Sequence, residues 1–337
     1  MIITKTPFRM SFFGGGTDMP DFFMENNGAI LSATFNKYCY VTLRHLPRFF
    51  NYTSEIVYSR IERVNSTGEI EHPLVRNIMR FLKMHELRIN YEADLPARSG
   101  LGTSSSFAVG LLNACYALKG KYVDKKRLAD EAIYVERTLC NEAGGWQDQI
   151  AVSFGGFNRI NFSADGYDVA PLILSHDVKN DLNRKLMLFF TGFTRLSSEV
   201  QKEGFPNSAD KTARLKEMYS LVGEAEKILV SGHSLDDFGR LLDYTWSLKR
   251  GISSVVSTNF IDRLYQTGRD AGALGGKLLG AGGGGFLVFY VPEENQGNVL
   301  KAMENLLYVP FEFESGGTKT IYYDTEHYDS ETRVEDN

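Results

Sequence analysis

The sequence predicts an α+β fold of two domains, and three observations support this prediction. The chain has 337 residues, about twice the length of roughly 150 residues that is usual for one domain. Strand-like and helix-like segments are mixed in both halves, as in α+β proteins. The pattern weakens between Gly166 and Asp181, just before a new buried strand at Lys185–Phe190. We therefore expect one domain at residues 1–175, a second at 176–325 and an acidic, solvated tail at 326–337.

In the first half, the spacing of apolar residues predicts each element in turn. Alternating apolar residues over Ala29–Arg44 indicate one or two strands, and Pro73 suits the first turn of a helix because it has no N–H to leave unpaired. Asp124 is a typical helix cap, and the helix after it should reach about Cys140. The remaining predicted elements of this half are a strand at Ile89–Ala93, a helix at Ser105–Leu118 and a strand at Asn158–Phe162.

In the second half, three amphipathic segments predict consecutive helices, at about 208–231, 234–249 and 258–271. Two β-branched and aromatic runs, Gly285–Val291 and Lys319–Tyr323, predict strands, and a helix near Asn295–Leu307 lies between them.

Composition excludes several classes of function. The net charge is −5 and no long run of Lys and Arg occurs, so we expect neither a nucleic-acid partner nor a membrane partner. The most apolar stretch, Leu278–Val291, has 14 residues and contains glycines, which is too short for a membrane span. The N-terminus resembles no secretory signal, and the three cysteines form no C-x-x-C pair, so we expect a cytoplasmic protein.

Glycine clusters mark two candidate sites. Residues 100–106, GLGTSSS, lie between a predicted strand and a predicted helix, where free N–H groups and the helix dipole favour an anion. This segment is either a phosphate-binding loop or a plain serine-capped helix. Residues 280–285, GAGGGG, match G-x-G-x-x-G, but they precede a strand instead of opening a helix, which argues against a dinucleotide site. Their backbone must approach either another backbone or a ligand closely.

Two carboxylates stand out near the middle of the chain. Glu136 falls within the apolar stripe of the helix that starts at Asp124, so it is either a buried acid paired with a cation or a metal ligand that faces a cleft. Asp148 follows 12 residues later, on a turn flanked by glycines. Arg9 lies among apolar residues before a triple glycine and would need an anion as its partner. No H-E-x-x-H and no G-x-S-x-G occurs, which argues against a zinc protease and a serine hydrolase.

Taken together, these segments resemble the motifs of the GHMP family of small-molecule kinases. Residues 7–18, PFRMSFFGGGTD, resemble its N-terminal substrate motif, residues 96–106, PARSGLGTSSS, its nucleotide loop, and residues 277–285, KLLGAGGGG, its C-terminal glycine motif. The resemblance covers nearly the whole chain. It implies an N-terminal domain like ribosomal protein S5 and a C-terminal ferredoxin-like domain, with the active site between them.

The resemblance also implies roles for single residues. Asp148 would accept the proton of the substrate hydroxyl, with Arg9 beside it to keep it ionised and to stabilise the transferred phosphoryl group. Glu136 and Ser104 would bind Mg²⁺. The ATP phosphates would bind to Gly100, Gly102, Thr103, Ser104, Ser105 and Ser106, and the substrate to Thr17, Asp18, Gly282 and Gly283. On physical grounds alone, Arg195 is a candidate cation for a phosphate on the substrate.

Within the family, the form SFFGGGTD resembles the sugar 1-kinases that act on D-glycero-D-manno-heptose 7-phosphate. The implied reaction is ATP-dependent phosphorylation of the anomeric C1 hydroxyl to the 1,7-bisphosphate, in the synthesis of GDP-heptose for surface glycans. The implied partners are a sugar phosphate and ATP, with a homodimer as one possible assembly. Lys249 and Arg250 are further candidate cations for the 7-phosphate, with solvated surface charges as the alternative, and Arg98 either touches a phosphate or faces solvent.

Two other functions remain open. One is a kinase for fucose or another sugar of the same family. The other is a regulator that binds sugar and ATP without catalysis, although the presence of Arg9, Glu136 and Asp148 argues against it. A GHMP decarboxylase is disfavoured by Thr17 and Asp18, which are typical of the sugar kinases.

Overall fold

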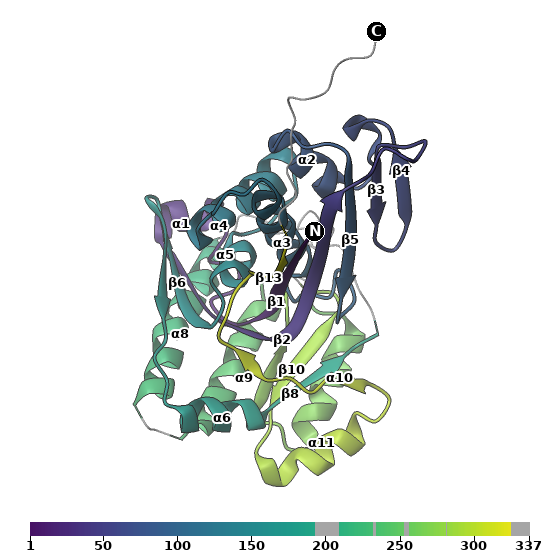
Figure 1. Ribbon diagram of the computed structural model, residues 1–337. Helices are drawn as coiled ribbons and strands as arrows, with labels where there is room; N and C mark the ends of the chain where they lie inside the picture. Colours follow the sequence, from purple (N-terminus) through teal and green to yellow (C-terminus); the bar gives the residue numbers. More distant parts are fainter. Residues whose placement is uncertain (193–208, 232–233, 253–255, 281, 325–337) are drawn as a thin grey trace.

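The computed structural model describes residues 1–192, 209–231, 234–252, 256–280 and 282–324. It contains two sheets with helices against them (Figure 1). The mixture of helices and strands in both halves confirms the α+β prediction.

The first sheet has nine strands and is centred on the long strand β2 (Gly28–His45). It runs β13-β1-β2-β5-β3-β4, and β6 and β12 pair with β2 where β2 extends past β5. All its pairs are antiparallel except β3 with β5. Its other strands are β1 (Ile2–Phe13), β3 (Ser54–Val57), β4 (Ile61–Val64), β5 (Leu87–Ala93), β6 (Phe157–Ser163), β7 (Gly166–Pro171), β12 (Phe313–Glu314) and β13 (Lys319–Tyr323).

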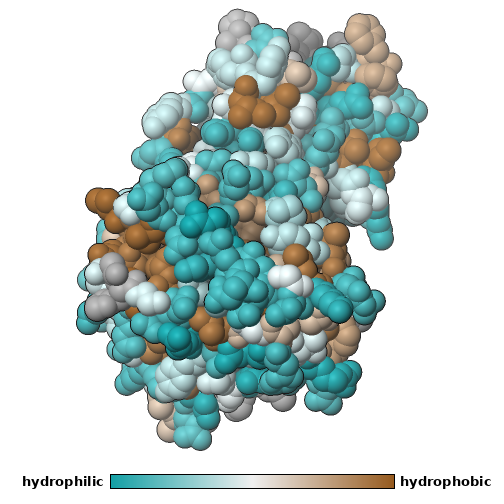
Figure 2. Space-filling model, turned by 90° about the horizontal axis from the view of Figure 1, so that it is seen from below, coloured by the Kyte–Doolittle hydropathy of each residue, from teal (hydrophilic) through white to brown (hydrophobic). Residues whose placement is uncertain are grey.

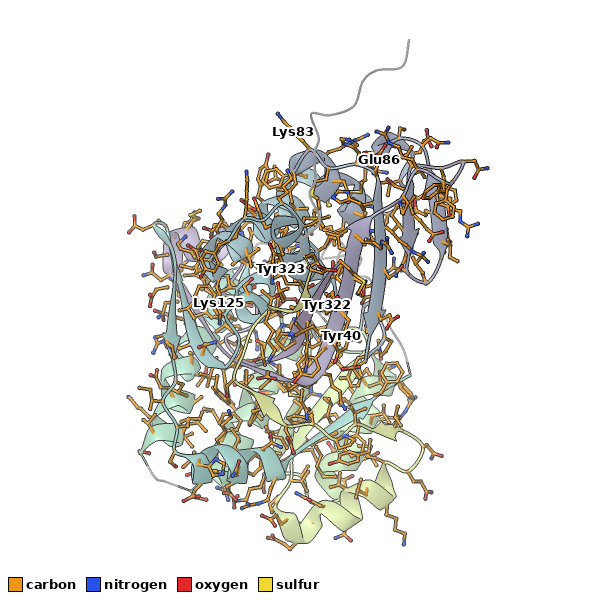
Figure 3. All side chains as sticks on the ribbon, viewed as in Figure 1. Tyr40, Lys83, Glu86, Lys125, Tyr322 and Tyr323 are labelled. Atoms are coloured by element: carbon orange, nitrogen blue, oxygen red, sulfur yellow. The ribbon has the colours of Figure 1, made fainter. Side chains whose placement is uncertain are left out.

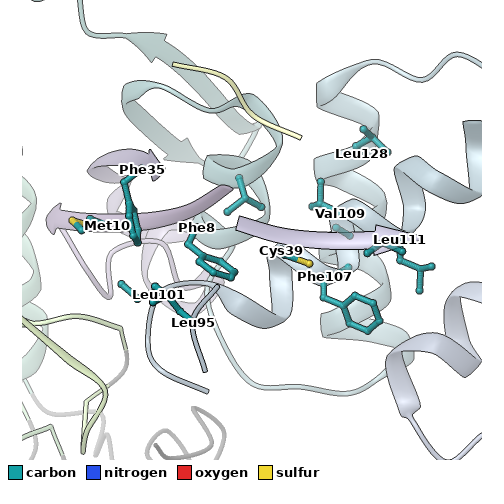
Figure 4. Packing of buried hydrophobic residues seen from close by; sticks show 14 of the residues in the cluster. Phe8, Met10, Phe35, Cys39, Leu95, Leu101, Phe107, Val109, Leu111 and Leu128 are labelled. Carbon is teal, nitrogen blue, oxygen red and sulfur yellow. The ribbon is translucent and has the colours of Figure 1, made fainter. Parts of the chain in front are cut away.

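Helix α3 (Thr103–Leu118) lies across this sheet and is buried along nearly all its length. Its side chains pack on those of β1 and β2, and Figure 4 shows Phe8, Cys39 and Val109 in this core. Gly110 lets α3 approach β1, because a Cβ there would lie 2.8 Å from the Thr6 hydroxyl. The other helices of this half are α1 (Pro20–Asn26), α2 (Pro73–Phe81), α4 (Lys125–Ile133) and α5 (Gln147–Phe154), with a short 3₁₀ turn at Thr67–Glu69.

The second sheet has four antiparallel strands in the order β11-β8-β10-β9. Helix α9 (Asp236–Arg250) packs on β9 and also reaches β1, which joins the two halves of the molecule. Seen from below, the molecule has a mostly hydrophilic surface with separate hydrophobic patches (Figure 2). Its other elements are α6 (His176–Lys185), β8 (Leu186–Phe190), α8 (Ala209–Val230), α10 (Asn259–Asp270), β9 (Gly275–Leu278), β10 (Phe286–Tyr290), a 3₁₀ turn at Glu293–Asn295, α11 (Gln296–Ala302) and β11 (Leu307–Tyr308).

Two features differ from the sequence-based expectations. The helix that starts after Asp124 is α-helical only to Ile133 and continues as a π-helix over Tyr134–Leu139. The strand Lys319–Tyr323, expected in the second domain, pairs with β1 at the edge of the first sheet, where Figure 3 shows Tyr322 and Tyr323. The domain boundary at residue 175 stays a prediction. The first sheet nevertheless includes two strands from the C-terminal end of the described chain, because β12 pairs with β2 and β13 pairs with β1. In the part of the chain that the structure describes, no helix is long and apolar enough to cross a membrane.

Candidate active site

A cleft of about 1450 Å³ opens between the two halves of the molecule. Its walls come from the N-terminal end of α3, the loop after β1, helix α1, the first turns of α8, the C-terminal end of α9 and the glycine loop before β10. The first motif, the turn before α3, Glu136, Asp148 and the glycine loop before β10, all singled out by the sequence analysis, contribute to these walls. The cleft is therefore the place where their side chains can act together.

The glycine-rich turn before α3 forms one wall of the cleft. Gly100 and Gly102 have φ of +81° and +75°, in the left-handed region that glycine adopts without strain. No side chain caps the first turn of α3, whose residues Thr103, Ser104 and Ser105 line the cleft. An uncapped helix N-terminus of this kind favours an anion. Ser106 differs from its neighbours, because it does not line the cleft and its hydroxyl donates a 3.0 Å hydrogen bond to the Pro7 carbonyl.

Glu136 is buried in the π-helix and faces the same turn. One carboxylate oxygen accepts from the Ser104 hydroxyl (2.8 Å), and the other accepts from the Ser105 hydroxyl (2.8 Å) and the Gln149 amide (2.5 Å). Glu136 is therefore not paired with a cation, which was one of its two predicted roles, because its hydrogen-bond partners are all neutral side chains. Irregular π turns are frequent at functional sites.

Arg9 and Asp148 form a two-point ion pair at the centre of the cleft. The guanidinium Nε and Nη2 each lie 2.8 Å from a carboxylate oxygen of Asp148. The third nitrogen, Nη1, donates to the Gly100 carbonyl at 2.7 Å, which ties the pair to the turn before α3. Asp148 lies in the first turn of α5, where the helix dipole favours a negative charge, and its side chain is 24% exposed against 4% for Arg9. The carboxylate therefore remains accessible from the cleft.

The loop after β1 places a second acid near Asp148. One oxygen of the Asp18 carboxylate accepts from the Gly16 N–H (3.1 Å) and the other from the Gln147 N–H at the start of α5 (3.3 Å). Burial, and then the nearby charge of Asp148, raise the pKa of Asp18. Thr17 does not line the cleft, because its hydroxyl donates to the Ala29 carbonyl and accepts from the Ala29 N–H.

The glycine loop before β10 closes the cleft from the second half. The backbone of Gly280 is in direct contact with that of Gly100. A Cβ at Gly280 would lie only 2.4 Å from the Gly100 Cα, so the contact has no room for a side chain. Gly282 lines the cleft, whereas the N–H of Gly283 donates to the Val256 carbonyl at 3.1 Å and serves the loop itself. The loop therefore approaches another backbone closely, as the first alternative has it, and contact with a ligand stays a prediction.

Comparison with known proteins gives the family. Residues 72–156 match the model of the GHMP kinases N terminal domain, and residues 222–309 match that of the GHMP kinases C terminal region. This chain belongs to the GHMP kinase family. It is therefore an ATP-dependent phosphotransferase that acts on a hydroxyl group, and its similarities place it among the sugar kinases of the family.

Three relatives are similar over nearly the whole length of this GHMP kinase. The D-glycero-alpha-D-manno-heptose 7-phosphate kinase of Campylobacter jejuni is 29% identical, over 95% of this chain and 98% of its own length. A crystal structure described as a D-glycero-D-manno-heptose 1-phosphate kinase from Bacteroides thetaiotaomicron has a TM-score of 0.77 at 24% identity and covers 96% of this chain and all of its own. The structure of a sugar kinase described as putative, from C. jejuni, has a TM-score of 0.73 at 27% identity over 95% of this chain and 97% of its own. The two-domain GHMP kinase fold is thereby confirmed.

Most of the predicted site residues of this GHMP kinase lie in the one cleft. Arg9, Asp18, Glu136 and Asp148 line it with Gly100, Gly102, Thr103, Ser104, Ser105 and Gly282. Thr17, Ser106 and Gly283 do not, for the reasons given above. Arg195 lies outside the described residues. Arg98 is exposed and also lines the cleft, and contact between its side chain and a phosphate stays a prediction.

Sequence reasoning missed several cleft residues or left their role open. Lys249 is partly buried and donates a 2.6 Å hydrogen bond to the Gly280 carbonyl, while its neighbour Arg250 forms an ion pair with Asp262. Lys277 is buried and donates to the Ser11 and Phe12 carbonyls at 2.7 and 2.9 Å. A lysine near the end of an amphipathic helix has the sequence pattern of a solvated charge, so only the packing of α9 reveals its place.

A group of aromatic residues at one end of the cleft was also missed. Tyr58 lies edge-on to His72 at 5.0 Å between ring centroids, His72 to Phe107 at 5.5 Å, and Tyr91 is tilted against Phe107 at 4.6 Å. Burial lowers the pKa of His72, which favours its neutral form. These four residues come from β5, α3, the turn between β3 and β4 and the residue before α2, and no short motif connects them.

Proposed function

We propose that this GHMP kinase transfers the γ-phosphoryl group of ATP to the C1 hydroxyl of D-glycero-D-manno-heptose 7-phosphate. The product would be the 1,7-bisphosphate, an intermediate on the way to a GDP-heptose used for surface glycans. The observation that carries this proposal is the similarity to the C. jejuni heptose 7-phosphate kinase over 98% of that protein's length. Ser11, Gly15, Gly16 and Asp18 of the first motif line the cleft together with Asp148, which supports an acceptor site there.

The proposed chemistry follows from the Arg9–Asp148 pair. The acceptor oxygen forms a bond to the γ-phosphorus, the bond to the bridging oxygen of ADP breaks, and Asp148 takes the hydroxyl proton. The two hydrogen bonds from Arg9 fix the orientation of the Asp148 carboxylate, and the Gly100 carbonyl holds Arg9 in turn. Positioning of this kind supplies a large part of the rate in phosphoryl transfer.

The cleft offers a separate region for each part of the nucleotide. The open N-terminus of α3 suits the phosphates, and the aromatic end formed by Tyr58, His72, Tyr91 and Phe107 suits a purine ring. Glu136 and the Ser104 hydroxyl are hard oxygen donors that fit Mg²⁺, with phosphate oxygens completing its coordination. When bound, Mg²⁺ would neutralise charge on the phosphates.

Asp18 would orient the sugar. Its carboxylate lines the cleft between Gly16 and Gln147 and can accept further hydrogen bonds from sugar hydroxyls. We also propose a cytoplasmic location, since the reaction consumes ATP and Cys39, Cys115 and Cys140 are free thiols.

The test is ADP release with Mg-ATP against D-glycero-D-manno-heptose 7-phosphate, mannose, fucose, galactose and mevalonate. Phosphorus NMR of the product locates the new phosphate, and an Asp148→Asn protein run in parallel excludes a contaminating kinase. We expect turnover of the heptose phosphate alone, with a new signal from C1. Faster turnover of fucose or another free sugar would reassign the acceptor, and no turnover of any compound would favour the regulator.

A further inference from the structure

Lys249 reaches the centre of the cleft from the second half of the molecule. Its ammonium donates to the Gly280 carbonyl at 2.6 Å, and Gly280 rests directly on Gly100. Arg9 donates to the carbonyl of the same Gly100 from the first half, at 2.7 Å. Two cations therefore lie on either side of one backbone contact, at the junction of the nucleotide turn and the glycine loop.

The charge on Lys249 lacks a direct partner. Arg9 is neutralised by its two-point pair with Asp148, whereas within the described ranges Lys249 forms no ion pair with a carboxylate. Partial burial, and then the charge of Arg9, lower the pKa of Lys249 to about 8, while Asp18 and Asp148 act in the opposite direction. A bound anion would relieve this repulsion, because it would attract both cations at once.

The backbone opposite Lys249 leaves the amine open to the cleft. A Cβ at Gly15 would lie 3.7 Å from the Lys249 nitrogen, so any larger side chain at this position would cover the amine. Gly15 and Lys249 both line the cleft. The triple glycine of the first motif thus provides space beside the ammonium as well as a turn.

We propose that Lys249 contacts the phosphoryl group in transfer, as a second cation beside Arg9. This inference rests on the proposed phosphoryl transfer in this cleft, but not on the identity of the sugar. Lys249 keeps its proton throughout, and no bond to it is formed or broken. Its charge offsets negative charge on the phosphoryl oxygens, as charge-assisted hydrogen bonds do in other phosphate sites.

The inference predicts a nucleotide preference that depends on pH. The charged groups around Lys249 are Arg9 from β1, Asp18 from the following loop, Asp148 from α5 and Lys277 from β9; α8 adds Lys211 and Lys216 to the same cleft. Burial, and then the charges of Lys249 and Arg9, lower the pKa of Lys277 well below its usual value. The pKa of Lys249 is about 8, so we expect this amine to lose its proton as the pH rises through that value.

The experiment measures dissociation constants of ADP and of the non-hydrolysable ATP analogue AMP-PNP, both with MgCl₂, by calorimetry. We expect Lys249→Met to weaken AMP-PNP binding by roughly 10- to 100-fold and to leave ADP binding within about twofold, since only AMP-PNP has the third phosphate. Lys249→Arg should keep the preference for AMP-PNP. The preference of the unmodified enzyme should fall between pH 7 and 9, and that of Lys249→Arg should not, because arginine stays charged.

The control is Lys301→Met, the same substitution at an exposed lysine in the last turn of α11, which should change neither constant. Equal weakening of both nucleotides by Lys249→Met, or no weakening, would overturn the inference. So would an increase in KM for a phosphorylated acceptor with unchanged nucleotide binding, which would assign the amine to the acceptor's own phosphate. If no sugar of the panel reacts but the AMP-PNP preference depends on Lys249, the proposed acceptor fails and this inference stands.

Discussion

The pairing of Arg9 with Asp148 decides what the carboxylate can do. Both oxygens accept hydrogen bonds from one planar guanidinium, which fixes the carboxylate in the cleft, yet each oxygen has a further lone pair for a substrate proton. Asp148→Asn keeps the shape of this side chain and removes its capacity to accept a proton. We expect kcat to fall by roughly 10² to 10⁴-fold, with ADP binding little changed, in steady-state kinetics and calorimetry.

A residual rate close to that of the unmodified enzyme would remove Asp148 from the role of base. Asp181→Asn serves as the matched control, because Asp181 pairs with Arg184 and Lys185 on α6, away from the cleft. The same change there should leave kcat unaltered. A loss at both positions would point to a general effect on folding instead of a missing base.

The sequence predicted these site residues unevenly, for physical reasons. Arg9, Glu136 and Asp148 could be predicted because each puts a charge where the local pattern is apolar or glycine-rich, and the family motifs connect them. Lys249 was only one of three candidate cations, with Arg195 and Arg250, since its own helix gives it the pattern of a surface lysine. Its role depends on how α9 packs against the first half, and that packing is not encoded in any local spacing.

At the level of elements, the contact between the two glycine-rich turns holds the cleft in shape. Gly280 has φ of +80°, and a Cβ there would lie 2.4 Å from the Gly100 Cα, so the two backbones meet without room for a side chain. Gly280→Ala should therefore cost at least about 1–2 kcal/mol from the left-handed conformation alone. We expect a lower Tm and a reduced kcat, since either turn must shift.

The matched control is Gly223→Ala in α8, where a Cβ would meet no atom within 4 Å. Alanine is favoured over glycine inside a helix by roughly 0.5–1 kcal/mol, so this variant should melt at a higher temperature than the unmodified protein. Equal Tm values for the two variants would contradict the importance of the Gly100–Gly280 contact.

The π segment shows a different limit of sequence-based prediction. The periodic pattern predicted one helix from Asp124 to Cys140, and the chain is indeed helical over nearly all of it. The switch to π geometry at Tyr134 coincides with Glu136, whose carboxylate bonds to Ser104 and Ser105 of another helix. A tertiary contact of this kind does not change the spacing of apolar residues, so the π segment could not be predicted from that spacing.

For the whole molecule, the last described strand determines how the two halves depend on each other. The pattern predicted the strand Lys319–Tyr323, but not its partner, because edge pairing with β1 depends on the full sheet. The residues before it also pack closely on α5, which carries Asp148. The Thr318 N–H donates to the Val152 carbonyl at 2.9 Å, and a Cβ at Gly317 would lie 2.1 Å from the Ser153 carbonyl oxygen.

This arrangement predicts that residues 1–175 do not form a stable unit alone. Without β12 and β13, the edge of β1 and the backbone of α5 lose partners, and the Thr6 hydroxyl loses its 2.8 Å hydrogen bond with Thr318. We expect the fragment to show no cooperative thermal unfolding by circular dichroism, and to regain it when co-expressed with residues 176–337. A cooperative transition of the fragment alone, at the Tm of the full chain, would show that the first sheet needs no C-terminal strand. Such a result would confine the role of β13 to holding the second half, and with it Lys249, against the cleft.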